Sequence, residues 1–397
     1  MRSTPSWRGR SEHRLSTTSS RPRWALSAWY FCYFAFVGAY APYFGLYLQS
    51  LAFSAWEISV LLSLTQLMRL IAPNLWGWLA EHSESRTRIV RIGALMSSLG
   101  FVGLYWTESF PGVFLCMAVM SFFWTAALPL VEALTLAHLH PNAERYSAIR
   151  IWGSIGFIAA VLGVGAILDA YPLSALLDID LLLLFGVFVC ALALVEAPRR
   201  EPNPARLDLA ADVRQRKLLL LIAATFLMAA AHGPFYVFYS IHLDAHGYGK
   251  TLIGSLWSLG VVAEIIVFIF MPTLLRRHSL RGLLTFSLAC AVLRFLTIGW
   301  GASSLLLMLL AQLLHGATFG ICHAAAMAAL HRWFPDKQQA RVQALYGSVS
   351  LGAGGMLGGL ASGQAWQWSG PGASFTLGAL FALAGLAVVW RGMREDG

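Results

Sequence analysis

Two glutamates and two arginines stand in the middle of long apolar runs: Glu132, Glu264, Arg69 and Arg294. The chain as a whole is only 12% charged. A charge at the centre of a membrane-spanning helix costs roughly 2.5–3.5 kcal/mol on insertion scales, so four such charges are hard to explain by packing alone. These residue types at this depth predict a polar pathway through a bilayer, and so a transport function.

Two acid–base pairs are candidates for the chemistry of that pathway. Glu132 lies towards the end of one apolar run and Arg150 begins the next after a short turn, so the two could pair. Such a pair either orients a substrate or locks two helices together. Glu264 lies near the centre of its run, where loss of water disfavours the charged carboxylate, so it can exchange a proton near neutral pH. Arg294 is expected to stabilise the ionised form of Glu264, either during proton coupling or as its partner in a static buried ion pair.

Three histidines add further proton donors and acceptors. His315 and His323 lie about two helical turns apart in one run and so share one helix face. Either could relay a proton or donate to a substrate, or be an ordinary buried histidine. His232 precedes Gly233 and Pro234. Because proline removes a backbone hydrogen bond, we expect a kink there that frees carbonyl groups beside a cavity, which His232 could line.

Arg69 and the aromatic side chains offer binding groups for a ring-bearing anion. Arg69 either holds an anionic substrate, because a guanidinium binds a carboxylate through two N–H groups, or it neutralises one of the two central glutamates. Aromatic side chains could stack on a substrate ring, or belong to helix packing and the interfacial belt. The aromatic candidates are Trp152, Tyr236 and Trp257, with the stripe Tyr40, Tyr43, Phe44 and Tyr47.

Long apolar helices must position these residues. Of the 397 residues 58% are hydrophobic and 12% are charged. A soluble domain carries about 25% charged residues, roughly twice that share. Runs near the ~20 residues that a helix needs to cross a bilayer predict an all-α membrane protein with twelve transmembrane helices. The predicted spans are 24–48, 56–80, 89–106, 111–138, 147–168, 174–196, 218–243, 251–275, 282–299, 304–330, 339–366 and 372–391.

The basic residues predict the orientation of these spans. Apart from Lys250 and the intramembrane Arg69 and Arg294, every Lys and Arg falls on one side of the alternating spans. By the positive-inside rule both termini then lie in the cytoplasm, which suits a multi-pass protein of the bacterial inner (plasma) membrane. The residues outside the spans are read as a disordered cytoplasmic N-terminal tail, 1–23, and a cytoplasmic C-terminal tail, 393–397.

The spans divide into two halves. A charged, Pro-rich stretch at 198–217 separates six spans from six and is read as a cytoplasmic linker. The bundles are therefore 24–197 and 218–392. The pattern Pro141…WGS (152–154) recurs as Pro335…YGS (346–348) at the same offset. Two pseudo-symmetric six-helix bundles are typical of a duplicated transporter, whose substrate site lies near the midplane between the halves.

No motif of an enzyme, motor or cofactor site is visible. The chain has no G-x-x-x-x-G-K-[ST] loop, HExxH or nucleophile elbow, and its five cysteines lie in apolar runs without a C-x-x-C pair. We therefore expect no cofactor, no metal and no enzymatic activity. The expected partners are the lipid bilayer, protons and a small-molecule substrate. Basic residues in short clusters between spans argue against nucleic acid, and a monomer is expected.

The stretch GWLAE at 77–81, followed by Arg86 and Arg88, resembles a degenerate form of the loop signature of the major facilitator superfamily. Glu81 replaces the usual Asp, and the downstream Gly is missing. Within that superfamily the chain resembles the phenylpropionate transporter group. The similar stretches are RIWGS (150–154), LWSLGVVAE (256–264), HGATF (315–319), CH (322–323) and RVQA (341–344). The resemblance implies the major facilitator fold, with alternating access to a central site.

The order of charges also resembles that of lactose permease, with an acid and an arginine in spans four and five, then Glu, Arg and His in spans eight to ten. That resemblance implies proton symport, with Glu132 and Arg150 on the substrate and Glu264, Arg294 and one span-ten histidine in coupling. The expected function is proton-coupled uptake of a small organic solute, first an aromatic carboxylate such as phenylpropionate. A cavity arginine without a partner would favour that acid.

Two alternatives stay open from the sequence. A proton-coupled symporter of a sugar (a lactose-type oligosaccharide) or of a nucleoside would bind through neutral hydroxyl partners alone. A non-transporting membrane sensor on the same fold belongs to another class of protein, and it would not need a titratable Glu264.

Overall fold

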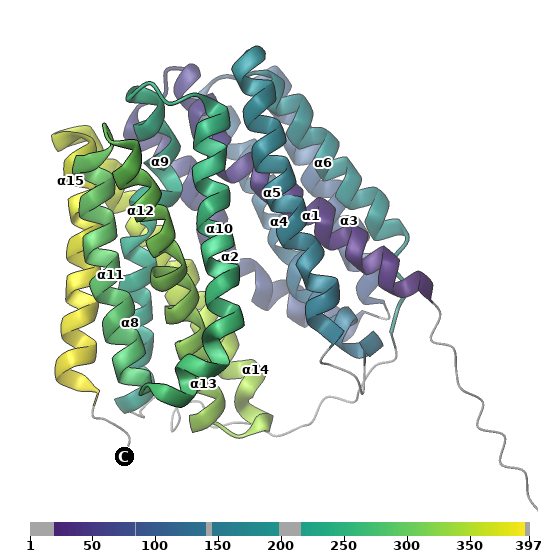
Figure 1. Ribbon diagram of the computed structural model, residues 1–397. Helices are drawn as coiled ribbons and strands as arrows, with labels where there is room; N and C mark the ends of the chain where they lie inside the picture. The colour runs from purple at the N-terminus through teal and green to yellow at the C-terminus, as the bar shows by residue number, and fades with distance from the viewer. Residues whose placement is uncertain (1–19, 84, 140–144, 198–215, 394–397) are drawn as a thin grey trace, which may run out of the picture.

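The computed structural model describes residues 20–83, 85–139, 145–197 and 216–393, and the regular structure of this part of the chain is helical. The first half consists of six candidate spans, and Figure 1 shows how they are arranged. Its helices are α1 (Ser20–Ser50), α2 (Ala55–His82), α3 (Arg86–Val102) with the short η1 (Gly103–Trp106), α4 (Phe110–Leu139), α5 (Tyr146–Ala170) and α6 (Ala175–Leu192). The Ser54–Glu57 capping box opens α2, because each side chain bonds the other's backbone N–H.

The second half contains the interrupted helices of the protein. Its elements are α8 (Arg216–Ala231), α9 (Gly233–Ala245), α10 (Lys250–Arg277), α11 (Leu280–Gly301), α12 (Leu305–His315), η3 (Gly316–Ile321), α13 (Cys322–Trp333), α14 (Asp336–Leu345), η4 (Tyr346–Gly354) and α15 (Gly355–Gly392). Two of them, η3 and η4, are π-helical. Segments of this kind are rare in proteins, and those that do occur are often found at functional sites.

The twelve predicted spans are confirmed. Eleven helical stretches of the described residues are long and apolar enough to cross a membrane. The last, Arg341–Gly392, has 52 residues and would measure about 78 Å as one helix, more than twice the ~30 Å hydrocarbon core. Gly370, with φ 80°, turns the chain back, and Ser374 then donates to the carbonyl of Ser362 (3.0 Å). The stretch is therefore two spans.

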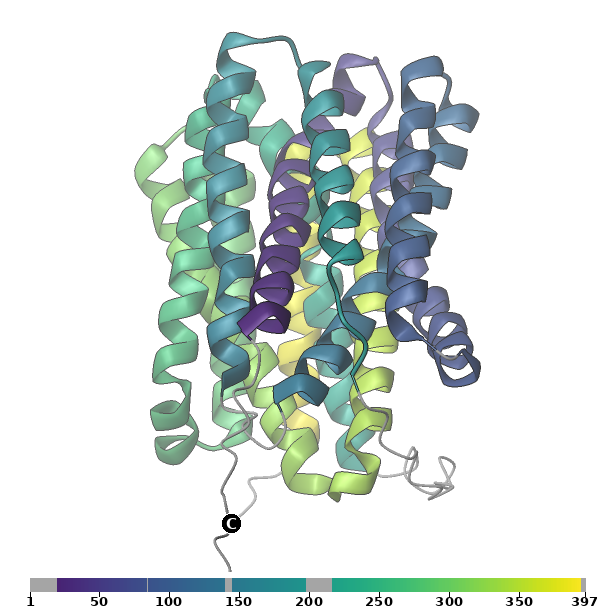
Figure 2. The same ribbon diagram turned by 90° about the vertical axis from the view of Figure 1, so that its right-hand side faces the viewer.

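The two halves lie side by side with both ends of the described chain at one end of the bundle (Figures 1 and 2). We call this the terminal end and the opposite one the far end. Within the first half α1 packs on α5 and α6, and α4 on α2 and α3. In the second half α15 packs on α8, α9 and α11. The halves meet where α2 contacts α15 and η4, and where α5 contacts α10.

Small residues let the helices of the second half approach closely. A Cβ added at Gly358 of α15 would meet the backbone of Ala230, and one added at Gly354 would lie 2.6 Å from the carbonyl oxygen of Phe226. α8 therefore packs backbone to backbone against the end of η4 and the start of α15, which the glycines at 354 and 358, four residues apart, allow. Regular helix is interrupted at His232, between α8 and α9, at the place where the sequence predicts a kink.

Four hydrogen bonds that join described residues of the two halves lie at the far end. Tyr43 of α1 donates to the carbonyl of Lys250 (3.1 Å). Asp169 of α5 accepts from the first two backbone N–H groups of α10, at 2.7 and 2.9 Å. The N–H of Trp56 donates to Gln367 (3.1 Å). The two halves are thus fastened at the far end.

The predicted tails and linker fall largely outside the described residues. Helix α1 begins at Ser20, so the predicted tail 1–23 is too long by its last four residues, and residues 1–19 lie outside the description. Of the predicted linker 198–217, Arg216 and Lys217 belong to α8, and the rest, from Pro198 to Gln215, is not described. Met393 ends the last helix, and 394–397 lie outside.

Candidate functional site

A cavity of about 340 Å³ lies between the two halves. α1, α2 and α4 line one side of it, and α8, α9, η3, α13, η4 and the start of α15 line the other. Small-molecule sites typically have volumes of ~300–1,000 Å³. Of the residues that the sequence predicts at the site, five line this cavity: Arg69, His232, Tyr236, His323 and, from the aromatic stripe, Tyr40.

Arg69 is the fixed charge of the cavity. It comes from α2, it is exposed, and its Nη1 donates weakly to Gln66 Oε1 (3.5 Å), one turn earlier. Among the described residues it forms no ion pair with Glu132 or Glu264. Of the two roles predicted for Arg69, neutralising a glutamate is therefore not what the geometry shows. No described lining residue carries a carboxylate, so the cavity has an excess of positive charge.

His232 lies at the helix break and lines the cavity. Its Nδ1 lies 2.9 Å from the carbonyl of Met228, and so carries a proton that it donates to that oxygen. Its Nε2 lies 3.5 Å from the hydroxyl of Thr318 in η3. The break at Gly233 and Pro234 thus turns a polar group of α8 towards a π segment of another span.

Aromatic side chains from both halves form part of the other walls of the cavity. Phe36 of α1 packs edge-on against Trp124 of α4, with ring centroids 4.6 Å apart, and stacks on Tyr40 at 5.4 Å. Tyr236 of α9 and Phe319 of η3 face them from the second half. Such rings offer flat apolar faces on which another ring can stack, at centroid distances of ~4.5–7 Å.

Arg294 lies behind the cavity wall and is fully buried, with 0% of its surface exposed. It does not pair with Glu264, so the predicted Glu264–Arg294 ion pair is wrong for this structure. Its guanidinium instead donates to the carbonyl of Ala311 (3.0 Å), to Gln312 and to Thr318 (both 3.4 Å). It also lies 4.3 Å from the ring centroid of Phe235. Dipoles and a π face thus replace the water that the cation loses.

Glu264 faces a histidine. Its Oε2 lies 3.8 Å from Nε2 of His315 in α12, and the two form an ion pair when the imidazole is protonated. His315 is buried, and its ring stacks on Phe319 with centroids 5.8 Å apart. Glu264 does not line the cavity, but Phe319 does. Glu264 therefore lies outside the cavity lining, and His315 connects it to Phe319, which lines the cavity.

His315 and His323 share one helix face, as their spacing predicts. Phe319 lies between them, stacked on both, and its centroid is 5.9 Å from that of His323. His323 lines the cavity, and its Nδ1 is 2.9 Å from the hydroxyl of Tyr346, the first residue of η4. His315, Phe319 and His323 thus form a stacked column. This column connects Glu264 on α10 to the π segments η3 and η4.

Glu132 and Arg150 form a separate group in the first half. The predicted ion pair between them is absent from the described residues. Glu132 accepts instead from the hydroxyl of Tyr146 (3.4 Å). The guanidinium of Arg150 lies 3.9 Å from the ring centroid of Phe34. Neither charge lines the cavity.

The two predicted tryptophans differ in their surroundings. Trp257 is buried behind the wall, where its indole N–H donates to Ser240 (3.0 Å) and its ring packs on Phe235 at 4.6 Å. It supports Tyr236, whose ring is 6.4 Å away. Trp152 is 37% exposed and is not among the lining residues. The roles predicted for Trp152, Glu132 and Arg150 stay predictions.

Several polar groups at or near the site escaped the sequence analysis. Gln66, Thr318 and Tyr346 line the cavity, but their residue types are common in helices and give no signal alone. Asp180 of α6 did give a sequence signal, because it is a charged residue inside an apolar run, like the two central glutamates and two central arginines. It is fully buried, and no described group hydrogen-bonds either carboxylate oxygen.

Residues 23–377 match the MFS_1 like family. The chain belongs to this family. It is a transporter of the major facilitator type and a multi-pass membrane protein, and its relatives are transporters, as expected for a chain that is not an enzyme. The predicted resemblance to that superfamily and to the phenylpropionate group is confirmed.

The named relatives of this transporter differ in their substrates. The probable 3-phenylpropionic acid transporter of Escherichia coli (strain K12) is 29% identical over 370 residues, with 91% of this chain and 95% of that protein covered. The maltose permease of Geobacillus stearothermophilus is 27% identical, with 85% and 87% covered. The crystal structure of nucleoside transporter NupG superposes with a TM-score of 0.80 at 20% identity, with 94% and 98% covered. That structure supports the fold.

Proposed function

We propose that the protein transports a small organic anion that carries an aromatic ring. The observation that carries this proposal is Arg69, an exposed guanidinium in the central cavity whose described polar partner is the neutral Gln66. A carboxylate accepts two parallel hydrogen bonds from such a group. No described lining residue carries a carboxylate. An anion that enters the cavity is therefore attracted by Arg69 and is not repelled by a negative charge of the described lining.

The walls suit the rest of such a substrate. Rings from both halves surround Arg69: Phe36, Tyr40, Trp124, Tyr236 and Phe319. The volume of about 340 Å³ accommodates one aromatic ring with a short side chain. The name of the Escherichia coli relative, a probable 3-phenylpropionic acid transporter, refers to a compound of this chemistry. We therefore take an arylpropionate as the first substrate class.

The proposed driving reaction is proton symport. Glu264 is the intramembrane acid beside His315, and the stacked column of His315, Phe319 and His323 leads from it to the cavity. Binding of an anion near His323 would favour protonated neighbours, because a negative charge stabilises an imidazolium. Arg294 fixes Thr318 next to His232, so it would act by positioning that wall.

The proposed direction is uptake across the bacterial inner membrane by a single chain. The basic residues predict cytoplasmic termini, so the terminal end would face the cytoplasm. The far end, fastened by the Asp169 contacts, would then be the closed outer gate. Both walls of the cavity come from one chain, and so a monomer would suffice.

Transport assays with Arg69→Gln test the substrate proposal. Purified protein in proteoliposomes would be assayed for uptake of radiolabelled 3-phenylpropionate under an inward proton gradient. The variant should lose at least tenfold in apparent affinity, because a hydrogen bond to a charged group contributes ~1.5–3 kcal/mol. Arg276→Gln is the matched control, since Arg276 is also exposed, donates one turn back to Thr273 (3.3 Å) and lies outside the cavity lining.

Competition by the uncharged amide of the same acid completes the experiment. Wild type should discriminate strongly against 3-phenylpropionamide, and Arg69→Gln should not. Equal uptake by wild type and Arg69→Gln would contradict the proposal.

A second candidate substrate class is a hydroxyl-rich neutral solute. Gln66, His323 and Tyr346 present neutral polar groups to the cavity, and the relatives include a maltose permease and a nucleoside permease. Including labelled maltose and uridine in the same uptake panel decides between the classes. Uptake of either compound without uptake of the acid would favour this second class.

A further inference from the structure

Three buried polar atoms behind the wall of the central cavity have no hydrogen-bond partner among the described residues. They are the hydroxyl of Tyr239 on α9, and Nε2 of Gln312 and Nδ1 of His315 on α12. All three side chains are buried, Tyr239 and Gln312 with 0% of their surface exposed. Because an unsatisfied buried polar group is costly, such groups normally bond a protein atom or an ordered water molecule.

These three groups lie together. Gln312 and His315 are about one turn apart on α12 and so share a face. Both face Gly260 of α10, where an added Cβ would lie 3.1 Å from Gln312 Oε1 and 3.3 Å from His315 Cδ2. Tyr239 approaches from α9. Its ring centroid is 5.9 Å from that of Trp257, one turn before Gly260, and Gln312 lies close enough to act on its hydroxyl.

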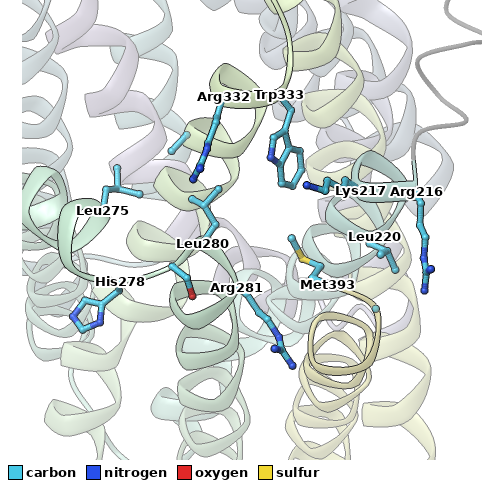
Figure 3. Close-up of a pocket in the computed structure, with 13 residues that line it drawn as sticks. Arg216, Lys217, Leu220, Leu275, His278, Leu280, Arg281, Arg332, Trp333 and Met393 are labelled. Carbon is cyan, nitrogen blue, oxygen red and sulfur yellow. The ribbon is translucent and has the colours of Figure 1, made fainter. Parts of the chain in front are cut away.

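Two cavities of the described chain do not reach this group. None of the three residues lines the central cavity. A second cavity, of about 470 Å³, lies at the terminal end of the second half, among the ends of α8, α10, α11, α13 and α15 (Figure 3). None of the three lines that cavity either. Water in these two cavities therefore does not satisfy the three atoms, whereas one enclosed water molecule would.

The hydrogen-bonding capacities of the three groups match one water molecule. Gln312 Oε1 accepts from Arg294 (3.4 Å), which leaves the amide Nε2 as a donor. Nε2 of His315 lies 3.8 Å from a carboxylate oxygen of Glu264, so the neutral ring carries its proton there and Nδ1 accepts. A water molecule would accept from Gln312 and from the hydroxyl of Tyr239, and donate to His315. Three bonds are typical of a buried water molecule.

We propose that Tyr239, Gln312 and His315 bind one water molecule, and that this water fixes the tautomer of His315 so that its Nε2–H faces Glu264. Tyr239 and Gln312 are then positioning residues, because the hydrogen bond at one ring nitrogen determines which nitrogen carries the proton. Once the pair closes to ~2.9 Å, the Nε2–H stabilises the ionised carboxylate. The role of the water rests on the proposed proton coupling by Glu264, whereas its binding does not.

Other charged or titratable groups face the pair of His315 and Glu264 from the neighbouring helices. They are Arg294 of α11, His232 at the break between α8 and α9, Tyr236 of α9 and, across the contact between the halves, Arg150 of α5. Removal of the uncharged hydroxyl of Tyr239 alters none of these groups. Tyr239→Phe therefore tests the water without changing the charges around the acid.

Hydroxyl-radical labelling tests whether the water is bound. Radiolysis of purified full-length protein in nanodiscs generates radicals from bound as well as bulk water, and mass spectrometry locates the oxidised side chains. Tyr239 should be oxidised roughly tenfold faster than Tyr43, because a buried water molecule would contact it. Tyr43 is equally buried, but its hydroxyl donates to the carbonyl of Val161 (2.7 Å). Equal rates would overturn the site.

The pH dependence of exchange tests the role of the water. Exchange of labelled for unlabelled 3-phenylpropionate in proteoliposomes, at equal pH on both sides, should fall as Glu264 loses its proton, because the proposed symporter carries substrate and proton together. In Tyr239→Phe the midpoint of this fall should move to higher pH by about 0.5–1 unit, since the ionised carboxylate loses one hydrogen bond. A wild-type midpoint in Tyr239→Phe would overturn the role of the water.

Ser258→Ala is the matched control. It also removes a buried hydroxyl that has no described partner, but Ser258 follows Gly254 by one turn, on a face of α10 that contacts Tyr43 and Val161 of the first half. Its midpoint should equal that of wild type. Equal shifts in both variants would assign the effect to any loss of a buried hydroxyl and overturn the role of the water.

The two measurements also separate this inference from the proposed function. Exchange by wild type that does not depend on pH would refute proton coupling, and the role of the water with it. The labelling experiment would still decide whether the water is bound.

Discussion

At the scale of single residues, the charged groups of the second half are separated rather than paired. Arg294 is satisfied by a carbonyl, an amide and a hydroxyl, and Glu264 faces His315. An intramembrane acid that is not neutralised by an arginine can change its protonation state at a lower cost than one held in an ion pair. This arrangement favours Glu264 as the group that exchanges a proton.

Glu264→Gln should uncouple transport from the proton gradient. The amide keeps the shape of the side chain but cannot titrate, so accumulation against a concentration gradient should fall to background. Exchange of labelled for unlabelled substrate across the same membranes should continue at near the wild-type rate. Glu108→Gln, an exposed acid at the far end, serves as the control. Full accumulation by Glu264→Gln would refute the assigned role.

Single residues also show which parts of the site the sequence predicts and which it does not. It identified Arg69, His232, Tyr236 and His323 as site residues because charge and polarity are rare in apolar runs, and these four line the cavity. It gave Arg294 the wrong partner, because the distance along the chain does not show which neighbours turn towards one another.

At the scale of elements, one glutamate fastens two helices of the first half at the terminal end. Glu196, after α6, accepts from the N–H of Thr87 (2.9 Å), the hydroxyl of Ser85 (3.0 Å) and Arg86 Nε (3.0 Å). It therefore caps the N-terminus of α3. Partial burial alone would raise the pKa of Glu196, but these hydrogen bonds outweigh it and hold the pKa below its ordinary value.

The stabilisation by Glu196 should depend on pH in a defined direction. A lowered pKa in the folded state means that the stabilisation is complete above the unfolded value, about 4.3, and is lost as pH falls through the folded value. Glu196→Gln should lower the free energy of unfolding by ~1 kcal/mol at pH 7. That difference should shrink towards zero below about pH 4.

Thermal unfolding in detergent at several pH values measures this effect. Glu108→Gln should match wild type throughout the range. A difference between Glu196→Gln and wild type that grows on acidification would contradict the assignment.

Element boundaries could be predicted where a local cause fixes them. The proline at position 234 acts within one turn of its own sequence, and the helix is interrupted where the proline predicts it. The capping box at Ser54, which opens α2, has an equally local cause. The π segments η3 and η4 could not be predicted, because glycines such as Gly316 and Gly347 permit them without requiring them. What selects a π turn there is packing against other spans, which a single run of sequence does not contain.

At the scale of the whole molecule, the two halves form one central cavity and are joined at the far end. Asp169 carries much of that joint, because its carboxylate accepts from two N–H groups at the positive N-terminus of α10. Alternating access requires this joint to open while the opposite end closes. The strength of this joint should therefore determine the relative populations of the state open at the far end and the state open at the terminal end.

Asp169→Ala should shift the protein towards states that are open at the far end. The shift in population should be about threefold, since a charge at an exposed helix N-terminus contributes ~0.3–1 kcal/mol. Spin labels at Tyr171 and His246, in a background without the five native cysteines, would report a larger share of long distances.

Asp178→Ala is the control for that experiment. Asp178 also lies near the far end, but it bonds Tyr105 within the first half (2.6 Å), so its loss should leave the distances unchanged. An unchanged distribution in Asp169→Ala would show that other contacts hold the joint.

The π segments place more residues in each turn than an α-helix does, and this surplus can be released. A residue given up to the neighbouring α-helix would rotate the remainder of that helix by about 100° around its own axis. Phe319 lies inside η3, and Tyr346 opens η4. A screw motion of a single helix could therefore carry an aromatic side chain into or out of the cavity wall, without any movement of one half against the other.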